Sequence, residues 1–198
     1  MTSERLQKIE AVLSKRQNDI TVVLENINDP HNISAIMRSC DAIGIQEIYI
    51  LNTKIPAYQK WDSRSSSSAM KWLTVHQFIN AAACFEAIRK KHLHILTTNL
   101  TSGAVSLYDL DLTQSVALVF GNEHSGVSEE IKAFADGNFA IPQVGMIRSL
   151  NVSVACAVSL YEAFRQRTTA GQYEKQTIDD KTYEVLKIKW TLNHETDQ

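Results

Sequence analysis

Polar and glycine residues follow four strand-like segments of this sequence, at the point where each segment ends. The groups are Glu25-Asn26, Thr97-Thr98-Asn99, Gly121-Asn122-Glu123 and, after Pro142 and Gly145, Ser149-Leu150-Asn151. In an open parallel sheet, ligands bind beyond the carboxyl ends of the strands. Strand ends that carry amides, hydroxyls and a carboxylate therefore predict a ligand-binding cleft at one edge of the sheet.

The common nucleotide and metal motifs do not occur in the sequence. Residues 121–126 (GNEHSG) lack the Gly-Lys-Ser/Thr ending of a P-loop, and no G-x-G-x-x-G follows the first strand-like run. His92 and His94 have no cysteine or carboxylate at ligand spacing, so we expect no metal site. A Ser-His-Asp triad stays open on spacing alone, although the G-x-S-x-G nucleophile elbow is missing.

The elements that would position this cleft alternate between strand and helix. Strand-like runs cover 20–26, 47–51, 93–99, 115–123 and 139–142, and helical patterns cover 3–17, 32–44, 74–91, 128–136, 150–167 and 179–192. The strands are continuous apolar runs, which is typical of strands covered on both faces. This alternation predicts an α/β fold with a mostly parallel sheet flanked by helices. Ser3 and Ser149 are the expected N-caps of the first helix and of the long helix near the end.

The composition favours a single globular domain in a reducing compartment. A chain of 198 residues that is 44% hydrophobic can bury a sizeable core without disulfides. The scattered residues Cys40, Cys84 and Cys156 are expected to be buried as small apolar groups. No signal-like segment follows Met1, and no apolar run approaches the roughly 18 residues of a membrane span. We therefore expect a cytoplasmic protein with no membrane partner.

The net charge of −2 argues against a nucleic-acid partner, but the basic residues are clustered. The clusters are Arg5, Lys8, Lys15 and Arg16, then Lys54, Lys60, Arg64 and Lys71, and finally Arg165 and Arg167. Composition leaves open whether they form ordinary solvated faces or a surface for RNA. The serine-rich stretch 63–68 is likewise either a surface loop or a segment that orders on substrate.

Three blocks of the sequence together resemble the SPOUT class of RNA methyltransferases, and within it the TrmH-type 2′-O-ribose methyltransferases. The blocks are NINDPHNISAIMRSCDAIG (26–44), LVFGNEHSGVSEE (118–130) and IPQVGMIRSLNVSVACAVSLYEAFRQR (141–167). The resemblance implies one domain with an N-terminal helical extension (1–18), a catalytic core (19–167) and a C-terminal helical extension (172–198). It also implies that the C-terminal part of the core threads a deep trefoil knot, an exception to the rule that chains are unknotted.

The resemblance also implies a cofactor and the residues of a site. The cofactor would be S-adenosyl-L-methionine, held by Thr98, Leu100, Gly121, Asn122, Ile141 and Leu150. The implied catalytic residues are Arg38, Asn32, Glu123, Ser149 and Asn151. Arg38 would hold an RNA phosphate and stabilise the forming alkoxide, because arginine is effectively never deprotonated in proteins.

The remaining implied residues would assist Arg38 or the substrate. Asn32 would orient Arg38, Glu123 would orient its loop or the target nucleotide, and Ser149 and Asn151 would contact the substrate. Arg148 stands where such relatives often have glutamine, and it leaves the exact target nucleotide open.

The implied reaction is 2′-O-methylation of a ribose in tRNA, with guanosine 18 of the D-loop favoured. Ribosomal RNA or another tRNA position is the alternative substrate, and a catalytically silent RNA-binding module on the same fold is the alternative of another class. The resemblance further implies a homodimer whose active site is completed across the interface. The terminal helices would then be the arms that contact the tRNA.

Overall fold

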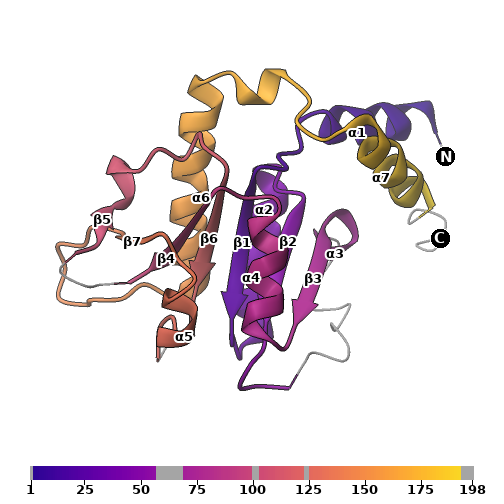
Figure 1. The fold of residues 1–198 in the computed structure, drawn as a ribbon. Helices are drawn as coiled ribbons and strands as arrows, with labels where there is room; N and C mark the ends of the chain where they lie inside the picture. The colour runs from indigo at the N-terminus through magenta and orange to yellow at the C-terminus, as the bar shows by residue number, and fades with distance from the viewer. Residues whose placement is uncertain (1, 57–68, 100–102, 123–124, 193–198) are drawn as a thin grey trace.

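The computed structural model describes residues 2–56, 69–99, 103–122 and 125–192, and it confirms the predicted α/β class. Seven parallel strands form one sheet with the order β3-β2-β1-β6-β4-β7-β5 (Figure 1). The strands are β1 (Ile20–Glu25), β2 (Glu47–Leu51), β3 (Thr74–Phe78), β4 (His94–Thr98), β5 (Val105–Ser106), β6 (Val116–Phe120) and β7 (Gly137–Ala140). Every carboxyl end in this sheet therefore lies at the same edge.

Helices cover both faces of the sheet, as the apolar strands require. They are α1 (Ser3–Leu13), α2 (Pro30–Ala42), α3 (Ala69–Trp72), α4 (Ala81–Arg89), α5 (Glu129–Lys132), α6 (Val152–Thr169) and α7 (Asp180–Leu192). Helices α2 and α6 pack on one face, and α4 and α5 on the other. Helices α1 and α7 pack together beside the sheet (Figure 1). Within the described residues, no helix is both long and apolar enough to cross a bilayer.

Two strands were not predicted from the sequence. Residues 74–91 were expected to be one helix, but β3 occupies the first five of them and pairs with β2. The helix begins only at Ala81, because the Asn80 side chain accepts a hydrogen bond from Ala83 N at 2.9 Å and caps it. Strand β5 has two residues, too few to give a periodic signal.

Two predicted helix caps are wrong by one or two residues. Thr2, not Ser3, caps α1, since its Oγ1 accepts a hydrogen bond from Arg5 N at 3.3 Å. Asn151, not Ser149, caps α6, since its Oδ1 accepts from Ser153 N at 2.8 Å. An asparagine caps a helix at least as well as a serine. The cap of α6 is therefore Asn151, directly before the first helical residue, and Ser149 remains in the preceding loop.

The core consists of two apolar layers, one on each side of the sheet. Side chains alternate along a strand, so that Val22 and Leu24 of β1 face α2 and α6 while Val23 faces α4. The three cysteines are fully buried in these layers, which confirms their predicted packing role.

Two arginines that the sequence placed in basic clusters are buried instead. Arg167 is 0% exposed, and it donates hydrogen bonds to Asp19 Oδ1 (2.6 Å), Leu112 O (2.9 Å) and Gln114 O (2.8 Å). Arg16 pairs with Asp41 and donates to Ile45 O at 2.9 Å. Burial lowers the pKa of Arg16, whereas the Asp41 carboxylate acts in the opposite direction. Arg167 joins α6 to the segments around Asp19 and Leu112, and Arg16 joins the end of α1 to Asp41 and Ile45, so their assignment to the surface was wrong.

Replacing Arg167 by alanine should cost about 3–5 kcal/mol of unfolding free energy, because the partners of a buried charge are left unpaired. Urea denaturation at neutral pH measures this loss. The matched control is Arg165→Ala in the same helix, where the side chain is 65% exposed and pairs with Glu162. That variant should lose less than about 1 kcal/mol. Equal losses would contradict the structural role of Arg167.

Candidate functional site

A cavity of about 380 Å³ opens at the edge where the parallel strands end. Strands β4, β6 and β7, the loop after β7 and the start of α6 all contribute to its wall. Five of the six predicted cofactor residues line it, and so does Ser149: Thr98, Gly121, Asn122, Ile141, Leu150 and Ser149. The sixth, Leu100, lies outside the described residues. The structure thus brings together residues that are more than 50 positions apart in the sequence.

The wall of this cavity is partly apolar and partly polar. Phe120 and Phe139 meet edge to face, with ring centroids 6.4 Å apart, and Val152 and Ala155 of α6 also line it. At its mouth, Asn99 N donates to Phe139 O at 3.0 Å and holds β4 against β7 beyond the end of the ladder. Such a slot suits a flat aromatic ring whose edge meets backbone groups.

Position 121 has room only for glycine. A Cβ atom on Gly121 would lie 2.2 Å from the carbonyl carbon of Gly126. The chain turns back here, since Gly126 N donates to Asn122 O at 2.8 Å and Gly126 has a φ of +65°. The Asn122 side chain donates to Asn26 O at 3.0 Å, so this turn is also attached to the end of β1. The close approach of two backbones forms one side of the cavity.

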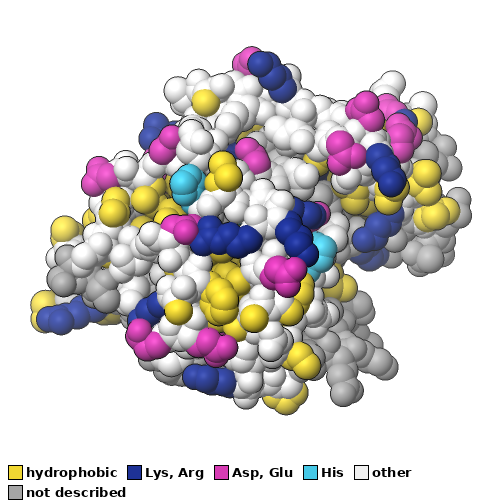
Figure 2. Space-filling model, viewed as in Figure 1, with side chains coloured by type: hydrophobic (Ala, Val, Ile, Leu, Met, Phe, Trp, Pro, Cys, Tyr) yellow, Lys and Arg dark blue, Asp and Glu magenta, His cyan; other side chains and the backbone are white. Residues whose placement is uncertain are grey.

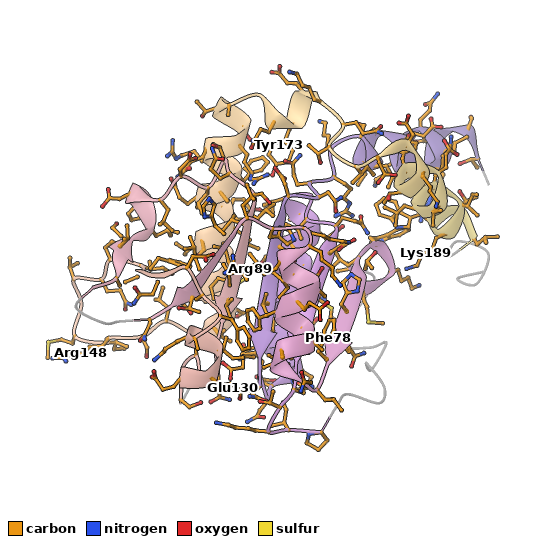
Figure 3. All side chains as sticks on the ribbon, in the orientation of Figure 1. Phe78, Arg89, Glu130, Arg148, Tyr173 and Lys189 are labelled. Atoms are coloured by element: carbon orange, nitrogen blue, oxygen red, sulfur yellow. The ribbon has the colours of Figure 1, made fainter. Side chains whose placement is uncertain are left out.

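The loop between β7 and α6, residues 141–151, extends away from the sheet. Its apolar side chains are exposed, at 106% for Val144, 98% for Met146 and 75% for Ile147. Gln143 Nε2 donates to Arg148 O at 3.3 Å across the loop. Arg148 lies at the far left of the view in Figure 3. Its side chain is exposed and is not part of the cavity wall.

The predicted catalytic residues are only partly brought together. Asn151 Nδ2 donates to Asn32 Oδ1 at 3.1 Å, which joins the start of α6 to the first turn of α2. Arg38 lies on the same helix as Asn32, is exposed, and is not among the residues that line the cavity. Glu123 lies outside the described residues. Within one chain, Arg38 is therefore separated from the cavity.

A second cavity, of about 660 Å³, adjoins the first under α5. It shares Asn122, Ser125 and Gly126 with the first cavity, and Glu25 at the end of β1 lines it. The sequence marked Glu25 as a polar strand end but gave it no role. Its position at the end of a fully buried strand was the available signal, because a carboxylate there must have a partner.

Charges of both signs are mixed on the face of the molecule that Figure 2 shows. In the view of Figure 2, Lys and Arg side chains lie among Asp and Glu side chains over α4, α5 and the terminal helices. Among the described residues, no group of three or more His, Cys, Asp or Glu side chains could hold a metal ion.

Comparison with known proteins gives consistent matches. Residues 19–161 match the model of the SpoU rRNA Methylase family. A tRNA (guanosine(18)-2′-O)-methyltransferase of Thermus thermophilus is 41% identical over 193 residues, 96% of either chain. The crystal structure of the TrmH/SpoU tRNA modifying enzyme of Aquifex aeolicus superposes with a TM-score of 0.88 at 34% identity, covering 96% of each chain. The SpoU methyltransferase AviRb of Streptomyces viridochromogenes, solved in complex with the cofactor AdoMet, has a TM-score of 0.70 at 26% identity, over 79% of this chain and 64% of that one.

Replacing Gly121 by alanine should weaken binding of S-adenosylmethionine at least tenfold, because the backbone at Gly126 must move away and open the cavity. Isothermal titration calorimetry measures this affinity. The matched control is Gly137→Ala, where a Cβ would meet only the end of the Leu96 side chain at 3.5 Å. If both variants bind the cofactor as the parent does, the close approach is not part of the site.

Proposed function

The chain belongs to the SpoU methylase family, and we propose that it is an S-adenosylmethionine-dependent methyltransferase for the ribose 2′-hydroxyl of guanosine 18 in tRNA. The observation that carries this proposal is the 41% identity to a named guanosine-18 enzyme along 96% of both chains. That similarity includes the terminal helices as well as the core. A protein that shared only the fold would not need the same helices at both ends.

The cavity at the ends of β4, β6 and β7 fits the cofactor. Its volume of about 380 Å³ and its apolar slot suit an adenine ring, and backbone groups near Thr98, Gly121 and Ile141 would meet the ring's edge. Leu150 would close the slot, and Asn122 would hold the turn beside it. When bound, S-adenosylmethionine would supply a methyl group on a positively charged sulfur; a hydroxyl oxygen can attack the methyl carbon while the carbon–sulfur bond breaks to leave a neutral thioether and the hydroxyl proton passes to solvent.

Arg38 would stabilise the charge that develops on the attacking oxygen. A guanidinium keeps its proton, so it can hold a phosphate next to the target ribose and stabilise the forming alkoxide. Asn32 would orient Arg38, and its hydrogen bond with Asn151 connects Arg38's helix to the loop that carries Ser149. Ser149 would contact the ribose, and Glu123 would orient the turn or the target nucleotide.

We infer that the active enzyme is a homodimer whose site is completed across the interface. The exposed apolar side chains of the loop 141–151 continue onto α6, where Val154 is 47% and Tyr161 53% exposed. Water-exposed apolar groups so close together favour contact with another protein surface. A second copy seated there would supply the Arg38 that one chain does not bring to its own cavity.

The terminal helices α1 and α7 would form the tRNA-binding arm. Two basic residues of α1, Arg5 and Lys8, and Lys15 just after it are candidates for this contact. Lys181 and Lys189 lie on α7. Binding through them would weaken with added salt, because phosphate contacts release counterions. Arg16 and Arg167 are excluded from this arm because they are buried. A tRNA substrate and buried free thiols fit a cytoplasmic enzyme.

We also propose that the chain is knotted in the manner of its family. Thr98 at the end of β4 and Val105 at the start of β5 lie on either side of Phe139 in β7. Both β4 and β5 precede β7 in the sequence, yet β7 lies between them in the sheet. This order of strands supports a threaded C-terminal segment.

Replacing Arg38 by alanine should lower methyl transfer by about 10²–10³-fold, the typical loss when one group that stabilises a developing oxyanion is removed. Affinity for S-adenosylmethionine should stay unchanged. Transfer of a radiolabelled methyl group to an unmodified tRNA transcript measures the first quantity, and calorimetry the second. A transcript with adenosine at position 18 is the substrate control, and Lys90→Ala at the end of α4 is the protein control. Near-normal turnover of Arg38→Ala would remove Arg38 from the mechanism.

Sharing of the site between two copies predicts complementation. At a cofactor concentration near the parental Kd, Arg38→Ala and Gly121→Ala should each be strongly impaired alone, whereas a mixed dimer should recover up to half of the parental sites. In that dimer, the intact cavity of the Arg38→Ala subunit meets the intact Arg38 of the other subunit. Co-expression with two different tags isolates the mixed species for the methyl-transfer assay. An inactive mixed dimer would place Arg38 and the cavity of one site in the same chain.

A further inference from the structure

The cavity under α5 adjoins the cofactor cavity. The two share Asn122, Ser125 and Gly126, and the cavity under α5 has a volume of about 660 Å³, within the usual range for small-molecule sites. A nucleotide whose ribose lies at the shared wall would place its base in the cavity under α5.

This cavity is rich in hydrogen-bond acceptors. Glu25, Glu129 and Glu130 contribute carboxylates to its lining. Of its two lysines, Lys132 already pairs with Glu129 at 2.7 Å, and Lys54 is the other. Figure 3 places Glu130 near the edge of the sheet where β1 ends. Such a lining disfavours a phosphate and favours a group that presents several N–H donors.

Glu25 is the buried carboxylate of this lining. It is 1% exposed, and its Oε2 accepts a hydrogen bond from Ser128 N at 2.9 Å. Within the described part of the chain, that is the single hydrogen bond of a group with about four acceptor positions. A buried carboxylate that is fixed by one backbone bond, with acceptor capacity left over, is suited to bind a donor pair of a ligand.

Guanine is the common RNA base that offers two adjacent donors, N1–H and the 2-amino group, on its Watson–Crick edge. The two oxygens of a carboxylate match this pair, whereas adenine presents an acceptor at N1 and cytosine an acceptor at N3. We propose that Glu25 determines the base specificity of the reaction, by accepting hydrogen bonds from N1–H and the 2-amino group of the target guanine. This proposal rests on the proposed function, since it names the residue that recognises the base at the methylated nucleotide.

Glu25→Gln provides the test, because it keeps the size of the side chain and the acceptor for Ser128 N. A glutamine side chain can donate an N–H to N1 of 2-aminopurine, which is an acceptor, and its oxygen has two acceptor positions, one for Ser128 N and one for the 2-amino group. The substrates are tRNAs that carry guanine, hypoxanthine or 2-aminopurine at the target position. Methyl transfer gives kcat/KM for each base with each protein.

The parent should prefer guanine over hypoxanthine by about tenfold, for one lost hydrogen bond, and over 2-aminopurine by about a hundredfold. Glu25→Gln should lose about tenfold or more on guanine and should methylate 2-aminopurine better than guanine. A variant that keeps the parental order of bases would overturn the proposal. If Glu25→Gln fails to fold, equal methylation of all three bases by the parent overturns it instead.

Two controls separate this result from other failures. A parent that methylates no tRNA would contradict the proposed function itself, before any question of base specificity. Glu47→Gln is the matched variant, because Glu47 is also a largely buried carboxylate at a strand end, bonded to Lys91 at 2.7 Å, but it starts β2 at the opposite edge of the sheet. It should lose stability and leave the order of bases unchanged.

Discussion

The parallel alignment of all seven strands is the constraint on which the molecule depends. It places every carboxyl end at one edge, so that short polar segments from β1, β4, β6 and β7 meet there although they are distant in sequence. It also makes both faces apolar, which requires the two helical layers. The cofactor cavity and the cavity under α5 are then adjacent openings along one edge, separated by the turn at Gly121.

The two edges of the sheet have different chemistry. At the amino end, charged groups are paired: Arg167 with Asp19, and Glu47 with Lys91 and His76. Burial opposes ionisation of Glu47, but hydrogen bonds from His76 and Lys91 outweigh it and lower its pKa to about 2. At the carboxyl end, glycines, amides and a carboxylate with acceptor capacity to spare form the cavity walls. The first edge contributes to stability, and the second leaves polar groups available for a ligand.

The parts of this arrangement that the sequence predicted are those that depend on local pattern. Apolar runs identified five of the strands, and the polar ends of those runs predicted a cleft. The family resemblance, not the pattern, supplied the residues of the cofactor cavity. Strand β3 was missed because Thr74–Phe78 is the outermost strand of the sheet, and its order of apolar and polar residues fits neither a strand nor a helix clearly. Its pairing with β2 decides its conformation. Arg16 and Arg167 were misplaced because burial of an arginine depends on carbonyl groups from distant loops, such as Leu112 O. Glu25 received no role because only the position of α5 shows that a cavity lies beside it.

Helices α1 and α7 come from opposite ends of the sequence, yet they share one small apolar core of Ile9, Leu13, Ile178, Leu186 and Trp190. The Lys187–Glu10 pair at 2.6 Å joins the same two helices. During synthesis α1 leaves the ribosome first, and α7 follows only after almost the entire remaining chain. The apolar face of α1 therefore lacks its α7 partner while the strands and the other helices described above are synthesised. A nascent chain of this protein should expose part of that face to chaperones until α7 has been synthesised, and the docking of α7 is the step that completes the arm.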